Sequence, residues 1–251
     1  MAIIRHKQLV STSNELRRML DAPDGRLLDD MTAVMADFQT AGRGQVGNSW
    51  ESQDGKNLLI SLLHRPMGLD VGLQFYVSMS VSLAIIDVVG PLLPSNVRRS
   101  LKIKWPNDIY VAQQKLAGIL IENRLSGRTI SDVIIGIGLN VNQRVFCSDA
   151  PNPVSIVNLT GAEYDVYLLA EAVVNSLRRR LRQVAEGDFM MLLQEYLSKL
   201  FWADGELHSF SDANGLFSAS ITSVAGDGRL TLTDSHGARR SYLFKEVEHI
   251  F

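Results

Sequence analysis

The most informative stretch of this chain is KIKWPND at residues 102–108, which KLAGIL follows at residues 115–120. Pro106 ends the first strand, because proline cannot donate to the hydrogen-bond ladder of a sheet. Asn107 and Asp108 then lie in the turn, and Lys115 begins a following strand. Lysines, an amide and a carboxylate on neighbouring strand ends suit a site that holds a nucleoside triphosphate beside a carboxylate, since a lysine there neutralises phosphate charge.

A glycine-rich motif, QTAGRGQVGNSW, lies upstream at residues 39–50. It contains G-x-G-x-x-G, the fingerprint of dinucleotide-binding loops, but such a loop opens a helix, whereas here polar, turn-rich residues lead into a strand. We therefore expect an anion-binding loop rather than a Rossmann motif. The guanidinium of Arg43 suits a phosphate or a carboxylate, and the indole of Trp50 suits the face of a base.

A third motif, GIGLNVN, lies downstream at residues 136–142. Glycines inside an apolar strand often mark the close approach of a ligand, and the amide of Asn140 can read an adenine edge. Each motif alone also fits a simpler role: a mobile surface loop, an Asn-Asp turn, a solvated lysine at a strand end, or a buried strand relieved by glycine. The three motifs in this order favour a single activity.

Composition sets the class of protein. The chain has 251 residues, of which 46% are hydrophobic, and a formal net charge of -2. This predicts a globular protein without an overall basic field for nucleic acid or membrane. The single cysteine, Cys147, excludes an internal disulfide and indicates a reducing compartment. The N-terminus lacks the apolar core of a signal peptide, and the apolar stretch at residues 71–90 carries enough polar residues to favour a buried helix. We expect a cytoplasmic protein.

The hydrophobic periodicity predicts an α+β fold, with a mixed β-sheet and helices. A first helix is expected to start at the polar cap of residues 11–14, and further helices are expected at residues 73–89, 165–185 and 189–200. Strands are expected at residues 31–38, 57–63, 101–105, 109–111, 116–123 and 131–141. Arg178, Arg179 and Arg180 are expected on the solvated face of their helix. After residue 200, short apolar runs alternate with Asp-Gly and Asn-Gly turns, which predicts a small antiparallel β-barrel.

These motifs together resemble the biotin protein ligase family, with the match running from Ser11 to Asn142. The resemblance implies a class II synthetase-like catalytic domain at residues 1–200 and an SH3-like β-barrel at residues 201–251. It implies a reaction in which MgATP and biotin, as substrates without a tightly bound prosthetic group, give biotinyl-5′-AMP and pyrophosphate. Biotin then passes to one lysine of a biotin carboxyl carrier protein, the biotinyl domain of acetyl-CoA carboxylase.

The resemblance also assigns site residues by position. The catalytic groups it implies are Lys115, Arg43 and Asp108. The residues implied for biotin are Ser11, Thr12, Ser13, Gln39, Arg43, Gly44, Gln45, Lys115 and Gly118. Those implied for the adenylate are Arg43, Trp50, Asn107, Lys115 and Asn140. No metal-ligand cluster is visible, and Mg²⁺ is expected to arrive with ATP, with Asp108 as a candidate ligand.

The chain departs from the family pattern in the glycine-rich loop and at the first helix. Many relatives carry arginine or other basic residues where this chain has Gln45, Val46 and Asn48, and an asparagine in place of Ser13. The sequence before Ser11 has no room for the helix-turn-helix of bifunctional relatives, so we expect a monofunctional ligase that binds neither DNA nor membrane. It is expected to be a monomer or a ligand-dependent homodimer.

Three other functions compete with this hypothesis. A lipoyl or octanoyl transferase shares this kind of catalytic fold, but its arginine- and glycine-rich signature with a histidine is not found. A biotin-responsive DNA-binding regulator is disfavoured by the slight acidity of the chain and by the lack of a helix-turn-helix. A catalytically dead binding module is disfavoured because Arg43, Asp108 and Lys115 are all present.

Overall fold

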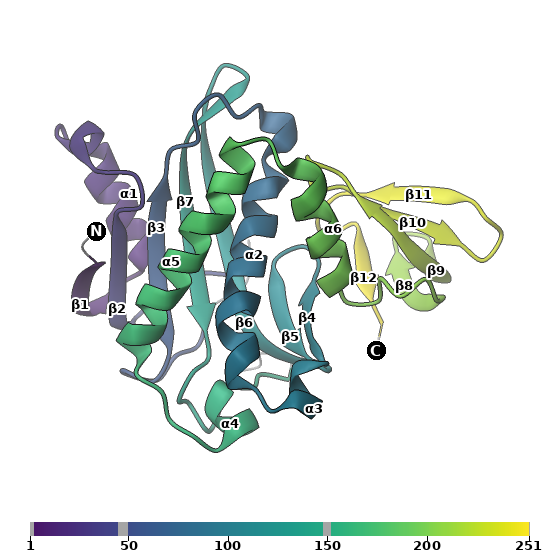
Figure 1. Cartoon of the computed structure of the whole chain (residues 1–251), viewed down its shortest axis with the longest axis horizontal. Coiled ribbons are helices and arrows are strands. Elements are labelled where there is room, and N and C mark those ends of the chain that lie inside the picture. The colour runs from purple at the N-terminus through teal and green to yellow at the C-terminus, as the bar shows by residue number, and fades with distance from the viewer. Residues whose placement is uncertain (1–2, 45–49, 148–151, 251) are drawn as a thin grey trace.

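A seven-stranded mixed sheet forms the centre of the molecule, with strand order β1-β2-β3-β7-β6-β5-β4 (Figure 1). The computed structural model describes residues 3–44, 50–147 and 152–250. β1 runs parallel to β2, and the other neighbouring strands of this sheet run antiparallel. The strands are β1 (Ile3–Leu9), β2 (Ala33–Gln39), β3 (Leu58–His64), β4 (Leu101–Lys104), β5 (Asp108–Val111), β6 (Gln114–Ser126) and β7 (Thr129–Leu139).

Helices cover both faces of this sheet. α2 (Phe75–Val89), α5 (Val166–Ala185) and α6 (Phe189–Lys199) lie across one face in Figure 1. α1 (Thr12–Asp21) packs on the other face, where Leu16 and Leu20 meet Val34, Leu63 and Ile134 in a separate apolar cluster. Successive side chains of a strand point to opposite faces, so Leu62 and Leu63 serve different clusters. Two short helices, α3 (Ser95–Arg98) and α4 (Ile156–Thr160), lie in connections.

The stretch from Val71 to Leu92 is long and apolar enough to cross a membrane by length and composition, but 67% of its most apolar window is buried inside the fold. It contains α2, whose side chains pack between the sheet and α5. The structure therefore confirms the predicted buried helix in this stretch.

A second, five-stranded antiparallel sheet follows α6, with strand order β11-β10-β9-β8-β12. Its strands are β8 (His208–Asp212), β9 (Gly215–Val224), β10 (Leu230–Asp234), β11 (Arg239–Tyr242) and β12 (Val247–His249). This is the antiparallel all-β segment that the turn-rich composition after residue 200 predicts, and it agrees with an SH3-like arrangement.

Two predictions from the sequence require correction. β1 is absent from the predicted strands, because Arg5, His6 and Lys7 interrupt the apolar residues; they are tolerated since this strand pairs along one side only, at the edge of the sheet. Arg180 does not lie on a solvated face: its side chain is 16% exposed and pairs with Asp87 of α2 at 2.9 Å and Glu195 of α6 at 2.6 Å. It therefore ties three helices together.

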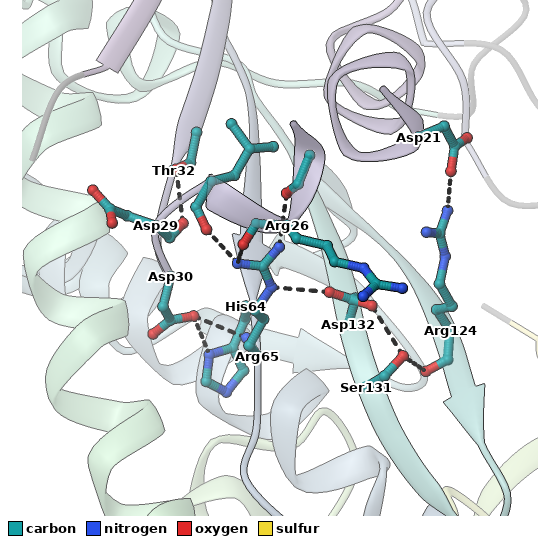
Figure 2. A network of polar contacts seen from close by, with 12 residues as sticks. Asp21, Arg26, Asp29, Asp30, Thr32, His64, Arg65, Arg124, Ser131 and Asp132 are labelled. Carbon is teal, nitrogen blue, oxygen red and sulfur yellow. Dashed lines mark hydrogen bonds and ion pairs between the residues drawn. The ribbon is translucent and has the colours of Figure 1, made fainter. Parts of the chain in front are cut away.

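A polar network fixes the loop that follows α1 (Figure 2). The guanidinium of Arg65, just after β3, donates to the carbonyls of Gly25 and Leu28 and to Asp132 of β7 at 3.0 Å. Asp30 accepts from the main-chain N–H of Arg65 at 2.8 Å and bonds Nδ1 of His64. The network holds the loop after α1 against the sheet, and Arg124 of β6 pairs with Asp21 at the C-terminal end of α1 at 2.6 Å.

Candidate functional site

A pocket opens on the face of the sheet that α1 covers, between the start of that helix and the loop after β2. Its walls come from the N-terminal turn of α1, the end of β2, the glycine-rich loop, and strands β3, β6 and β7. It is lined by Ser11, Thr12, Ser13, Gln39, Arg43, Gly44, Trp50, Ile60, Asn107, Asp108, Lys115, Gly118, Ile119, Leu120, Gly136, Ile137 and Gly138. Residues from all three sequence motifs thus meet in one cavity.

The three hydroxyl residues before and within the first turn of α1 are buried. Thr12 donates to Oε1 of Gln39 twice, from its main-chain N–H at 2.7 Å and from its hydroxyl at 3.1 Å. These bonds orient the Gln39 amide and tie the start of α1 to the end of β2. Ser61, a buried residue of β3, contacts the hydroxyls of both Thr12 and Ser13.

Lys115 and Asp108 form an ion pair at the pocket, with 2.8 Å between Nζ and Oδ1. Both side chains keep about a quarter of their surface, 27% and 21%, exposed, so the lysine can reach a ligand. The main chain of Lys115 is fixed by bonds to Asn152 and Val154. The side chain of Asn107 is tied to β6, because its amide donates to the carbonyl of Ile119.

Trp50 lies on a platform made by two glycines. Gly118 of β6 and Gly138 of β7 are direct cross-strand partners. A Cβ at Gly138 would lie 2.5 Å from Cε2 of Trp50, and one at Gly118 would lie 2.9 Å from its Cζ3. Any side chain there would displace the indole, so the glycines of both motifs are explained by close approach. Nζ of Lys115 lies 5.7 Å from the centre of the indole ring, within the range of a cation–π contact.

Arg43 is held at the pocket by Glu122 of β6, with 3.1 Å between its Nη2 and the carboxylate. The other carboxylate oxygen binds Arg17 of α1 at 2.5 Å. Sequence reasoning missed Glu122 because a lone glutamate late in a strand carries no motif. The available signal was its position four residues after Gly118, within the strand that carries Lys115.

Burial and nearby charges shift the pKa values of two side chains, Tyr110 and Lys104, on the strands beside this site. Burial, reinforced by the negative charge of Asp108, raises the pKa of the Tyr110 hydroxyl to about 12. Burial also lowers the pKa of Lys104, and the positive charge of Lys115 adds to that effect, while Asp108 and Glu248 oppose it. Lys104 is the cross-strand partner of Asp108, so its charge belongs to the electrostatic environment of the pocket.

Among the described residues assigned by resemblance, Asn140 does not line the pocket. Asn140 is buried, and its amide donates to the main-chain carbonyls of Val154 at 3.0 Å and Lys115 at 3.5 Å. Its contact with adenine stays a prediction. Gln45, together with Val46 and Asn48, lies outside the described residues. Within residues 3–44, 50–147 and 152–250, no group of three or more His, Cys, Asp or Glu side chains could hold a metal ion.

The fold and the sequence match those of known ligases. Residues 20–140 match the model of the Biotin/lipoate A/B protein ligase family. The chain is similar to the Biotin protein ligase from Aquifex aeolicus in complex with biotin and ATP, with a TM-score of 0.77, 24% identity, and 99% of each chain covered. A point mutant of that protein, in complex with biotin, gives a TM-score of 0.72 at 26% identity, covering 99% of this chain and 97% of the other.

Curated relatives agree. The Bifunctional ligase/repressor BirA of Bacillus spizizenii is 30% identical over 241 residues, which cover 92% of this chain and 68% of that protein. The Biotin--[acetyl-CoA-carboxylase] ligase of Paracoccus denitrificans is 31% identical over 170 residues, covering 66% of this chain and 69% of that protein. Fold and sequence thus define an acyl-group ligase. The chain belongs to the biotin/lipoate A/B protein ligase family.

Proposed function

We propose that this chain is a biotin protein ligase, which activates biotin with ATP and transfers it to a lysine of a carrier protein. The observation that carries the proposal is the pocket itself. The pocket brings together a wall formed by Ser11, Thr12, Ser13 and Gln39 with Arg43, Lys115 and Trp50. One cavity thus offers hydrogen-bonding groups for an uncharged polar ring together with cations for a carboxylate and a phosphate.

The chemistry has two steps. In the first, an oxygen of the biotin carboxylate bonds to the α-phosphorus of ATP, and the bond to pyrophosphate breaks. In the second, the amine of the acceptor lysine attacks the acyl carbon, loses a proton, and AMP leaves. Lys115 would neutralise charge at the α-phosphate in both steps, and Arg43 would hold the carboxylate and phosphate oxygens. Catalysis is then mostly positioning, without a covalent bond to the enzyme.

The other pocket residues take roles that follow their places. Ser11, Thr12, Ser13 and Gln39 would contact the ring of biotin, with Gly44, Gly118 and the undescribed Gln45 beside it. Trp50 and Asn107 would contact the adenylate. Asp108 holds Nζ of Lys115 at 2.8 Å, so we infer that it orients this lysine; any contact with the Mg²⁺ of ATP would come through the same carboxylate. Asn140 would act at the adenine edge or through the main chain of Lys115.

The acceptor we propose is the biotinyl domain of a carboxylase, because relatives are named for acetyl-CoA-carboxylase. We also propose that the chain acts in the cytoplasm, as a monomer or a ligand-dependent homodimer, and binds neither specific DNA nor membrane; the net charge of -2 supports the last point. A division near residue 200, into a catalytic part at 1–200 and a smaller part at 201–251, is supported by the start of the second sheet after α6.

Pyrophosphate release tests the function. Purified protein with ATP is given biotin, lipoate or octanoate, and the pyrophosphate formed is followed by a coupled assay. We expect release with biotin, and transfer of label to a carboxylase biotinyl domain when that domain is added. Release with lipoate or octanoate alone would favour a lipoyl or octanoyl ligase, and release with none of the three would favour a binding module.

A further inference from the structure

Ser61 lies beneath the wall of the pocket and is absent from its lining. Its side chain is fully buried on β3, and its residue is the cross-strand partner of Gly136 on β7. Its hydroxyl oxygen lies 2.8 Å from that of Thr12 and 2.9 Å from that of Ser13. Ser61 therefore connects two residues of the wall from below.

Hydrogen bonds connect Gln39, Thr12, Ser61 and Ser13 in series, and the main-chain N–H of Thr12 determines the direction of each of them. The main-chain N–H of Thr12 can only donate, so the atom that it meets at 2.7 Å is the carbonyl oxygen of Gln39. That oxygen can only accept, so the hydroxyl proton of Thr12 also points to it, at 3.1 Å. Since a hydroxyl has one proton, Ser61 must then donate to Thr12.

The same count continues to Ser13. The single proton of Ser61 is used at Thr12, so the contact with Ser13 requires Ser13 to donate to Ser61. As a result, Oγ of Ser13 offers only lone pairs to the pocket. The amide nitrogen of Gln39, whose oxygen is already engaged, offers only N–H groups. The wall thus presents an acceptor next to a donor, with a fixed polarity.

We propose that Ser61 is a positioning residue that sets this polarity and thereby the preference of the site for biotin. The inference rests on the proposed function. A cyclic urea carries an N–H donor beside a carbonyl acceptor and complements the wall, whereas a dithiolane ring or an alkyl chain offers neither and would leave the wall groups unpaired. Without Ser61, the hydroxyl of Ser13 loses the acceptor that fixes its proton, so Ser13 no longer presents only lone pairs and the complementarity is lost.

The test compares Ser61→Ala with the wild type and with Ser82→Ala. Ser82 is also a fully buried serine, but its hydroxyl donates to the carbonyl of Ser78 within α2, on the other face of the sheet. Biotin binding is measured by isothermal titration without ATP, and kcat by pyrophosphate release at saturating biotin. We expect Ser61→Ala to raise the Kd for biotin about tenfold while kcat changes less than about twofold, and Ser82→Ala to change neither.

Two further variants show whether Ser61 acts through its hydrogen bonds to Thr12 and Ser13 or only through packing. Ser61→Cys keeps a weaker donor at the same place and should give an intermediate Kd. Ser13→Ala removes the oriented acceptor, so combining it with Ser61→Ala should raise the Kd for biotin by clearly less than the product of the two single effects. Circular dichroism and thermal melting establish that each variant folds.

The outcomes distinguish this inference from the proposed function. If the wild type does not bind biotin, the proposed function fails. If the wild type binds biotin and Ser61→Ala binds it with an unchanged Kd, the inference about Ser61 is overturned and the function stands. Additive effects in the double variant, or a loss of kcat with an unchanged Kd, overturn it as well.

Discussion

Lys115 is a cation of the pocket that contacts both the carboxylate of Asp108 and the indole ring of Trp50. We expect Lys115→Ala to slow biotin-dependent pyrophosphate release about a hundredfold, or roughly 3 kcal/mol, because a charge-assisted contact to the reacting phosphate is lost. The main chain at this position is held by its own bonds, so the thermal melting curve should hardly move. Lys199→Ala, at the exposed end of α6, is the control, and near wild-type release by the Lys115 variant would contradict the assignment.

His249 is the buried histidine of the second sheet. Burial, with the positive charges of Lys104 and His208, lowers its pKa to about 3, whereas an unfolded histidine has a pKa near 6.5. As the pH falls below about 6.5, the unfolded chain therefore gains a proton that the folded chain refuses. This residue should thus lower the free energy of unfolding by about 1.4 kcal/mol per pH unit down to about pH 3.

Denaturant titrations at several pH values between 6.5 and 4.5 measure this effect. We expect His249→Leu to lose stability less steeply with falling pH than the wild type. His236→Leu, at an exposed turn, should keep the wild-type slope. Parallel slopes for the wild type and His249→Leu would show that this histidine is protonated in the folded state over that range.

At the residue scale, the sequence could place what stands in contiguous motifs. Lys115, Asn107 and Asp108 line one pocket, because adjacent antiparallel strands bring the end of one turn and the start of the next strand together. Glu122 and Ser61 could not be found in this way. Their importance depends on partners that lie 79 and 48 residues away in the chain, and only tertiary packing shows which acid or hydroxyl meets them.

At the element scale, β6 connects the two ends of the pocket. Lys115 lies at its start, and Glu122 in its second half anchors the arginine of the glycine-rich loop. Arg43 uses one of its N–H groups in the contact with Glu122, which leaves the rest of the guanidinium for a ligand. Glu122 therefore holds Arg43 at the pocket and leaves the other N–H groups of the guanidinium available to a ligand.

We expect Glu122→Gln to release biotinyl-5′-AMP roughly fivefold faster, which corresponds to about 1 kcal/mol; the partial exposure of both side chains keeps the effect small. The measurement is single-turnover formation of the adenylate without acceptor, followed by its dissociation. Glu195→Gln, which also removes an acid from an arginine pair but on the other face of the sheet, should leave the rate unchanged. Unchanged or slower release from the Glu122 variant would mean that Arg43 needs no anchor.

Element prediction from sequence succeeded where one periodicity dominates. The strand expected at residues 57–63 is β3 (Leu58–His64), and the helix expected at 165–185 is α5 (Val166–Ala185). It failed for β1, because the charged residues of this edge strand give its sequence the pattern of an irregular chain terminus. It also failed for Arg180, because burial of an arginine depends on acids from two other helices.

At the scale of the whole molecule, the change of composition near residue 200 predicted a second unit but not how it packs. Nε1 of Trp105 donates to the carbonyl of Gly228 at 3.0 Å, and the main-chain N–H of Phe75 donates to Gly226 at 2.8 Å. The ring of Phe244 contacts those of both Phe75 and Trp105. These contacts join residues more than a hundred positions apart, so no local pattern could reveal them.

Trp105 also directly precedes Pro106 in the turn that carries Asn107 and leads into β5 at Asp108. The second sheet therefore supports the turn at the pocket through one indole. We expect Trp105→Phe to lower the free energy of unfolding by about 1–2 kcal/mol, because the Gly228 carbonyl loses its donor and the smaller ring leaves a void. The turn should also lose its fixed position, so kcat for adenylate formation should fall severalfold. The Kd for biotin should stay nearly constant, because the proposed hydroxyl contacts of biotin lie on α1.

Calorimetry and single-turnover kinetics measure the two effects. Trp202→Phe, an aromatic change beside β8 that does not adjoin the turn, is the control for stability loss alone. A Trp105 variant that melts earlier but forms the adenylate at the wild-type rate would mean that the second sheet stabilises the molecule without positioning its chemistry.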